Sequence, residues 1–223
     1  MHHGAPTFRL KMEAIARAVS LGKKVHLVNS LWQENPPDFD ATLRQLAEIT
    51  VREVLSARDL EERHGVSAGV APDFSYFAPV HRSWFRRNWA GKLVTSEYRK
   101  PETGKWTSLD EGPLAKAPAA NLKSMSWSRV VNSLKGAKLF VTGRHHGVYA
   151  ACRAEVPFLA YGGNSHKIEG IIASAGVNIP VFERPDNLAE QIERCLSLRS
   201  EYDALFHWMA SQPKWKYDPA ARR

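Results

Sequence analysis

Two short turns in the second half of the chain gather residues whose types suit chemistry on an anionic substrate. The first turn is Thr142-Gly143-Arg144-His145-His146, and the second is the Gly-Gly-Asn-Ser-His-Lys sequence at 162–167. Each turn follows an apolar run and precedes a helix-like segment, which is the pattern of a strand that leads into a helix. Histidine can transfer protons near neutral pH, and Arg144 and Lys167 supply positive charge. The two turns therefore predict an anion site with a histidine beside it.

The position of the two turns supports the same interpretation. The strands that precede them are expected at 138–142 and 157–161. If these strands are neighbours in a parallel sheet, about 5 Å apart, both turns open at the carboxyl edge, where α/β proteins bind ligands. Helix N-termini at that edge present N–H groups and a positive dipole, which suit a phosphate or a carboxylate.

Each turn also has a purely structural interpretation. The two adjacent histidines can simply begin a helix, with one ring buried and the other exposed. Gly162-Gly163 can be a tight connection, and Asn164 or Ser165 can cap the helix that follows. Lys167 lies in the first turn of that helix, against the dipole preference, which favours a ligand-facing role for its side chain.

A metal site is not expected at the histidine pair. Adjacent positions on a helix point about 100° apart. Neither a carboxylate nor a cysteine stands at ligand spacing near His145 and His146 in the sequence.

The elements that must position these turns follow a β/α alternation, which is typical of parallel sheets covered by helices. Helices are expected at 8–21, 39–47, 56–64, 128–134, 145–153 and 165–175, with one long or two consecutive helices over 187–210. Strands are expected at 24–29, 49–52, 93–95, 138–142, 157–161 and 180–182, with a strand edge within 66–76. The alternation stops between 81 and 128, where a Pro-, Gly- and Lys-rich loop follows residue 100. We therefore predict an N-terminal lobe at 1–85 and a C-terminal lobe at 86–223.

The composition indicates a folded, basic protein. The 223 residues are 43% hydrophobic, which is enough for one large or two small α/β domains. The sequence contains no run of about 18 apolar residues and no signal peptide, and its two cysteines form no motif, so a reducing cytoplasm is expected. The net charge of +8 favours anionic partners such as nucleic acid, phosphorylated small molecules or anionic carrier lipids.

Basic and aromatic residues alternate in the segment from His81 to Trp89. Such a pattern can bind nucleic acid by stacking and charge, or it can form a linker whose tryptophans pack against the lobes. We favour the linker, and expect no nucleic-acid partner, because no known nucleic-acid module surrounds the segment. The Walker loop, the G-x-G-x-x-G turn and the G-x-S-x-G elbow are also missing from the sequence, which argues against three common enzyme classes.

The stretch 141–171 resembles the polysaccharide pyruvyl transferases. That family carries an Arg-x-His motif at the end of a strand, then a helix of small residues, a strand opened by proline, and a lysine. The corresponding residues here are Arg144-His145-His146, Val156-Pro157 and Lys167. The stretch 49–77 is also similar to the family, with the ordered matches Val51-Arg52, Ser56, Gly65 and Pro72-Asp73.

The resemblance implies a GT-B-like α/β fold with two Rossmann-like lobes and parallel sheets. It implies transfer of pyruvate from phosphoenolpyruvate to two hydroxyls of a free or lipid-linked sugar or glycan, with no metal or organic cofactor. His146 aligns with the catalytic histidine of the family. Arg52, Arg144, Asn164 and Lys167 are the expected substrate-binding residues.

Three further histidines are candidates for the site: His145, His166 and His3. His145 replaces a residue that is usually apolar in the family. Family members usually begin with a strand and a glycine-rich loop that helps to form the acceptor side, and His2-His3 stand where that loop is expected. We therefore expect a first lobe that is shortened at its N-terminus.

Two other functions stay open at this point. A GT-B-like glycosyltransferase that uses a nucleotide sugar is one, because the same fold serves both chemistries. A basic nucleic-acid-binding protein is the other, because of the net charge of +8 and the segment at 81–89.

Overall fold

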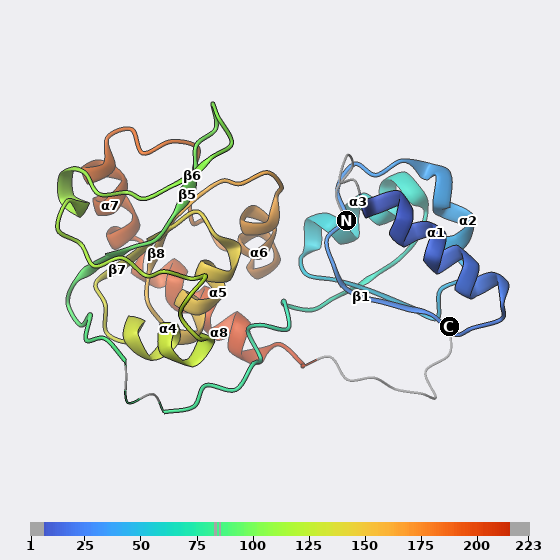
Figure 1. Ribbon diagram of the computed structural model, residues 1–223, viewed down its shortest axis with the longest axis horizontal. Coiled ribbons are helices and arrows are strands. Elements are labelled where there is room, and N and C mark those ends of the chain that lie inside the picture. Colours follow the sequence, from blue (N-terminus) through green and yellow to red (C-terminus); the bar gives the residue numbers. More distant parts are fainter. Residues whose placement is uncertain (1–6, 83, 85, 215–223) are drawn as a thin grey trace. The chain divides into compact units, whose positions relative to one another are not determined.

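The computed structural model describes residues 7–82, 84 and 86–214, which divide into two compact units (Figure 1). The first unit comprises 7–74, 165–174 and 212–214, and the second comprises the described residues of 75–164 and 175–211. Each unit contains a parallel sheet with helices, so the predicted α/β class is confirmed.

The predicted lobes, 1–85 and 86–223, differ from these units in three places, one of which is residues 212–214, assigned to the first unit. The second unit begins at Ser75, and residues 165–174 pack with the first unit although they follow the second sheet in sequence. The compact units show which residues pack together, whereas the predicted lobes are continuous stretches of the sequence. The lobe boundaries therefore stay a prediction.

The first unit is built on three parallel strands in the order β1-β2-β3. The strands are β1 (His26–Ser30), β2 (Glu48–Val51) and β3 (Gly69–Val70). The helical elements are α1 (Thr7–Ser20), η1 (Pro37–Phe39), α2 (Asp40–Leu43) and α3 (Val54–His64). Large apolar side chains fill the core between sheet and helices, and Trp32 and Met12 at its centre are 0% exposed.

Helix α2 is shorter than predicted. A helix was expected over 39–47, but α2 ends at Leu43 and a turn follows. The N–H of Ala47 donates a hydrogen bond to the carbonyl of Val25, with 2.9 Å between nitrogen and oxygen. The chain has therefore already joined the sheet at this point, and sheet pairing overrides the local helical pattern.

The second unit contains a four-stranded parallel sheet in the order β4-β7-β8-β9. Its strands are β4 (Leu93–Thr95), β7 (Leu139–Thr142), β8 (Phe158–Tyr161) and β9 (Val181–Phe182). Strands β7 and β8 are hydrogen-bonded neighbours, with Val141 opposite Leu159. The structure therefore meets the condition that the two strands preceding the turns are neighbours in a parallel sheet.

Both faces of this sheet are covered, which explains why β7 and β8 are apolar throughout. Val141 and Tyr161 pack in one cluster with Ile192 of α7 (Leu188–Ser197). On the other face, Tyr202 of α8 (Arg199–Ser211) packs edge-to-face on Phe158. Helices α4 (Trp127–Leu134) and α5 (His145–Ala154) lie near α8 in Figure 1. The pattern at 187–210 forms two helices, which break at Leu198.

An antiparallel hairpin occupies part of the predicted loop after residue 100. It pairs β5 (Tyr98–Arg99) with β6 (Trp106–Thr107), and η2 (Gly112–Leu114) follows. Gly104 has a left-handed φ of +64°, and its N–H donates to the carbonyl of Lys100 at 2.8 Å. Strands of two residues are too short for an alternating pattern, so this hairpin could not be predicted from the sequence.

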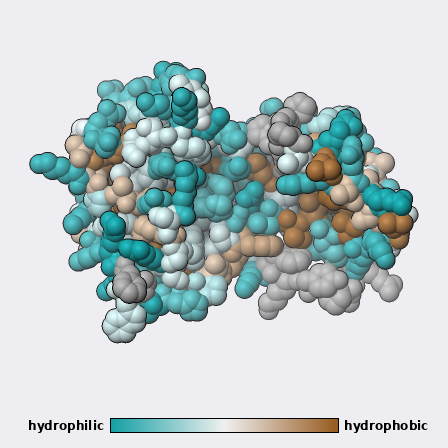
Figure 2. All heavy atoms as spheres, in the orientation of Figure 1, coloured by the Kyte–Doolittle hydropathy of each residue, from teal (hydrophilic) through white to brown (hydrophobic). Residues whose placement is uncertain are grey.

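Apolar residues reach the surface of the first unit in places (Figure 2). On α1, Leu10 is 67% exposed and Leu21 is 56% exposed, whereas Phe8 and Met12 are buried. Within the ranges that the structure describes, no helix combines the length and the apolar character that a membrane crossing requires.

Gly143 closes the turn after β7, and its environment leaves no room for a side chain. A Cβ atom there would lie 2.6 Å from the Cα atom of Tyr98. We expect Gly143→Ala to lower the free energy of unfolding by about 1–3 kcal/mol, because backbone must shift. The measurement is urea unfolding followed by circular dichroism. Gly163→Ala is the matched control, since a Cβ there meets no described atom within 4 Å. Equal losses in the two variants would contradict this role of Gly143.

Candidate functional site

His145 and His146 begin helix α5 directly after strand β7. The Thr142 hydroxyl accepts hydrogen bonds from Ser96 Oγ at 2.8 Å and from the Arg144 N–H at 3.1 Å, which fixes the backbone between strand and helix. The two imidazole rings stack, with centroids 3.9 Å apart and planes at 38°. His146 is exposed and His145 is half-buried. The turn thus presents the predicted catalytic imidazole to solvent on a rigid support.

Arg144 is held by two groups of its own unit. Its Nε donates to Glu97 Oε2 at 3.0 Å, and its Nη2 contacts the same oxygen. Its guanidinium carbon lies 4.0 Å from the centroid of the Trp106 ring, so the guanidinium stacks on the indole. The hydrogen bond from Arg144 is the main reason why the pKa of Glu97 lies below its usual range. A ligand anion at Arg144 must therefore share this cation with Glu97 or displace the carboxylate.

Arg52 and Lys167 both belong to the first unit. Arg52 directly follows β2, and its Nη1 lies 2.6 Å from Asp73 Oδ2. Its Nε is buried and has no hydrogen-bond partner among the described residues. Lys167 is the first residue of α6 (Lys167–Ala175), and its pKa is lowered, first by burial and then by the charge of Arg52. Two cations and one carboxylate therefore influence one another here, and their summed charge of +1 would be balanced by one further negative charge.

A cavity of about 470 Å³ lies beside Arg52 within the first unit. This volume is in the range of small-molecule sites. The cavity is lined by Lys11, Ala14 and Ile15 of α1, by residues 27–31 at the end of β1, and by Arg52. Asn29 lines it with a left-handed φ of 53°, and its Oδ1 is buried with no hydrogen-bond partner in the described part of the chain. The cavity thus lies at the carboxyl edge of a parallel sheet, which is where α/β proteins bind ligands.

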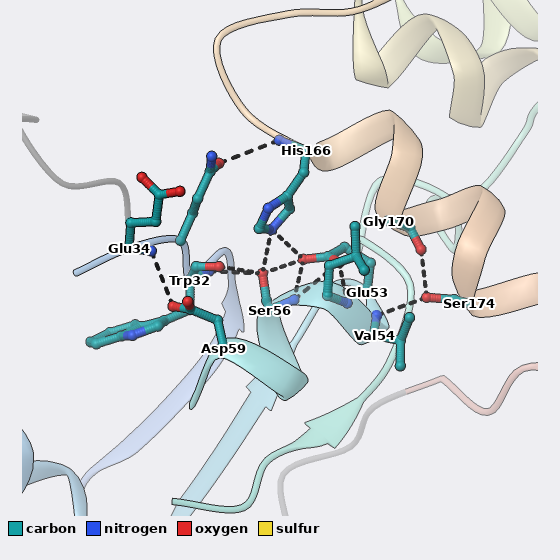
Figure 3. A network of polar contacts seen from close by, with 11 residues as sticks. Trp32, Glu34, Glu53, Val54, Ser56, Asp59, His166, Gly170 and Ser174 are labelled. Carbon is teal, nitrogen blue, oxygen red and sulfur yellow. Dashed lines mark hydrogen bonds and ion pairs between the residues drawn. The ribbon is translucent and has the colours of Figure 1, made fainter. Parts of the chain in front are cut away.

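His166 is engaged in a polar network of the first unit (Figure 3). Its Nε2 lies 3.3 Å from Glu53 Oε1 and 3.4 Å from Ser56 Oγ. Its backbone N–H donates to Gln33 Oε1 at 3.3 Å. Ser56 Oγ also lies 2.9 Å from both the N–H and the carbonyl oxygen of Trp32.

The network contains a serine, a histidine and a glutamate, but it does not have the geometry of a catalytic triad. In a triad the acid and the nucleophile bind opposite nitrogens of the imidazole. Here Glu53 and Ser56 both face Nε2 of His166. Ser56 is also 0% exposed, so its hydroxyl cannot reach a substrate. The network is therefore a packing and orienting device.

The structure places the predicted residues in both units. His145, His146, Arg144 and the exposed Asn164 belong to the second unit, whereas Arg52, His166 and Lys167 belong to the first. The turn at 162–167 thus divides between the units after Asn164. His3 lies outside the described residues. The chemical roles of all these residues stay predictions.

Sequence reasoning missed Glu53, Glu97 and Trp106. Glu53 caps α3 through its side chain, but N-caps are typically Ser, Thr, Asp or Asn, so its signal in the sequence was weak. Glu97 and Trp106 had none. They lie on the hairpin, and only the folded chain brings them to Arg144.

The described part of the segment 81–89 runs along helix α4. The N–H of His81 donates to Ser128 Oγ at 3.0 Å, and the N–H of Arg87 donates to Ser133 Oγ at 2.8 Å. Trp89 is 3% exposed, whereas Trp84 is 84% exposed. Residues 83 and 85 lie outside the described residues. The packing of Trp89 agrees with the linker interpretation, which stays a prediction.

Comparison with known proteins places this chain among transferases. The family model described as polysaccharide pyruvyl transferase matches residues 34–165, which is more than half of the chain. A search of curated proteins gave no match. The chain is similar to a solved structure described as the glycotransferase of kitacinnamycin, with 13% identity and a TM-score of 0.50, covering 90% of this chain and 69% of that one. This likeness shows a GT-B-like fold, as predicted.

A second solved structure with some likeness is a UDP-glucosyltransferase from Polygonum tinctorium capable of glucosylating indoxyl. It is 11% identical, with a TM-score of 0.45, and the match covers 90% of this chain and 70% of that one.

The ion pair between Glu97 and Arg144 predicts a pH effect on stability. The pKa of Glu97 is lowered in the folded state, so the pair stabilises the fold above the ordinary carboxyl pKa of about 4.3 and stops doing so as pH falls through the lowered value. We expect Glu97→Gln to be less stable than wild type at pH 6, with a difference that shrinks towards pH 3. Urea unfolding at several pH values measures it. Glu102→Gln is the control, because the Glu102–Arg184 pair is half-exposed. A difference for Glu97→Gln that does not depend on pH would contradict this role.

Proposed function

The chain belongs to the polysaccharide pyruvyl transferase family, and on that premise we propose that it transfers pyruvate from phosphoenolpyruvate to a sugar, forming a ketal. The observation that carries this proposal is the family match over 34–165, because it spans both Arg52 and the Arg144-His145-His146 turn. The exposed imidazole of His146, at the carboxyl end of a buried parallel strand, supports it.

The proposed reaction needs a proton donor and a proton acceptor. The methylene carbon of phosphoenolpyruvate gains a proton, and a sugar hydroxyl oxygen bonds to the neighbouring carbon. The phosphate group then leaves, and a second hydroxyl oxygen replaces it on the same carbon, with loss of the hydroxyl protons. His146 is the proposed acid or base for these transfers, because imidazole exchanges protons near neutral pH. The reaction uses no metal or organic cofactor.

The donor carries a carboxylate and a phosphate, so it needs several cations. Arg52 and Lys167 are the proposed holders of one anionic group. The carboxylate of Asp73 pairs with Arg52 and partly opposes the lowering of the Lys167 pKa, so two positive charges face one negative charge. Arg144 is a further proposed contact for a donor anion, with Glu97 giving way to it. Asn164 is exposed and offers an amide for hydrogen bonding.

The acceptor is proposed to be a sugar or glycan, either free or lipid-linked. The cavity beside Arg52 supports this, because its volume is in the range of small-molecule sites and the polar residues Lys11, Asn29 and Ser30 are among those that line it. The likeness to a glycosyltransferase concerns the fold alone, so it does not favour a nucleotide-sugar donor.

We expect His146→Ala to reduce ketal formation by about 10²–10⁴-fold, which is the usual contribution of a general acid or base. The assay follows release of inorganic phosphate from phosphoenolpyruvate in the presence of glycoside acceptors. The melting temperature should change little, because the His146 side chain is exposed. His207→Ala, at an exposed position on α8, is the matched control and should retain full activity. Full activity of His146→Ala would remove His146 from the mechanism.

We also expect phosphoenolpyruvate to raise the melting temperature in a thermal-shift screen, because a ligand that binds the folded state stabilises it. Inorganic phosphate should give a smaller shift, since it lacks the carboxylate. If a nucleotide sugar raises the melting temperature and phosphoenolpyruvate does not, the nucleotide sugar becomes the donor and phosphoenolpyruvate is excluded.

A further inference from the structure

We propose that Glu53 is a positioning residue, which holds Arg52 and Lys167 beside each other through its contact with His166. The inference rests on the proposed function in one respect, namely that the anion bound by the two cations is the donor. It assigns a role to a buried carboxylate that touches no substrate.

The contact between Glu53 and His166 lies next to two cations in the sequence. Arg52 directly precedes Glu53, and Lys167 directly follows His166. Glu53 Oε1 lies 3.3 Å from His166 Nε2 (Figure 3). The distance between the end of β2 and the start of α6 is therefore fixed at the residues next to the two cations.

The Glu53 carboxylate is almost completely buried, since the residue is 1% exposed. It accepts hydrogen bonds from the N–H of Leu55 at 2.7 Å and from the N–H of Ser56 at 3.0 Å, and the hydroxyl of Ser56 donates to it. A buried carboxylate is costly unless donors surround it. Nε2 of His166 lies 3.3 Å from Oε1 of this carboxylate, so the residue that directly precedes α6 brings an imidazole to the same group.

Helix α6 approaches Glu53 closely because residue 170 is a glycine. A Cβ atom at Gly170 would lie 2.5 Å from Cγ and Cδ of Glu53. Further along, the N–H of Val54 donates to Ser174 Oγ at 2.8 Å. Helix α6 thus packs against the N-terminus of α3 at Gly170 and Ser174, with Lys167 at its first position.

Two like charges placed together repel each other, so something must hold them. The effect of Arg52 on Lys167 is visible in the lowered pKa of the lysine, for which burial is the larger cause. A capping role alone does not explain the contact, because the N–H groups of Leu55 and Ser56 already satisfy Glu53 as a cap. The bond to His166 is the additional element, and it keeps the cation pair assembled before an anion arrives.

The test compares His166→Ala and Gly170→Ala with His166→Gln, which keeps a side-chain donor. Asp59→Asn is the matched control, because Asp59 lies on α3 and accepts the Glu34 N–H at 3.1 Å without touching α6. The full chain is used throughout. The readouts are the pKa of Lys167 by side-chain NMR, the affinity for inorganic phosphate by calorimetry, and KM and kcat with phosphoenolpyruvate.

We expect His166→Ala and Gly170→Ala to raise the pKa of Lys167 towards its ordinary value, because the ammonium moves into solvent away from Arg52. Phosphate affinity should fall about tenfold, which corresponds to the loss of one hydrogen bond. KM for phosphoenolpyruvate should rise more than kcat falls. His166→Gln should restore part of each property, and Asp59→Asn should change none of them.

Unchanged Lys167 pKa and phosphate affinity in both His166→Ala and Gly170→Ala would overturn the role of Glu53, whichever donor the protein uses. If the two variants weaken phosphate binding while wild type leaves phosphoenolpyruvate intact, the positioning role stands and the proposed donor falls. If His166→Ala does not fold, Gly170→Ala and His166→Gln decide the question by the same measurements.

Discussion

The burial of the Glu53 carboxylate is the constraint on which the first unit's site depends. A carboxylate that is 1% exposed must be surrounded by donors, and its donors come from two elements far apart in sequence. The first turn of α3 supplies backbone and hydroxyl donors, and the segment before α6 supplies an imidazole. The contacts that surround the Glu53 carboxylate therefore hold α6 in place, and Lys167 is the first residue of that helix.

A steric constraint organises the second unit. The residue that follows strand β7 must lack a side chain, because the backbone of Tyr98 passes directly against Gly143. That close approach brings the hairpin of β5 and β6 alongside the turn, and with it Glu97 and Trp106. The backbone of Arg144 is fixed by Thr142, and its guanidinium is fixed by the hairpin.

The two units treat their strand-end arginines in the same way. Arg52 follows β2 and pairs with Asp73, and Arg144 follows β7 and pairs with Glu97. A carboxylate partner orients a guanidinium and reduces the cost of its desolvation, which prepares it for a ligand anion. The sequence predicted Arg144 from its strand-to-helix turn, and it predicted Arg52 through the family resemblance. It did not predict Glu97, and it offered Asp73 only as part of a family motif.

The sequence by itself determined the parallel α/β class and the placement of the polar turns at strand ends. These features are written in local patterns of apolar residues, glycines and caps, which act over one turn or one strand. It also determined the family through short ordered motifs within 34–165.

Tertiary structure alone decided which side chains hold the functional residues. Ser56 and His166 are 110 positions apart, and Glu97 and Arg144 are 47 apart. It also decided that α2 stops at Leu43, because strand pairing at Ala47 competes with the helix, and that residues 165–174 pack with the first unit. The physical reason is the same in each case. Pairing of buried charges, close backbone approach and sheet registration depend on groups that meet only after the chain has folded, and no local pattern records them.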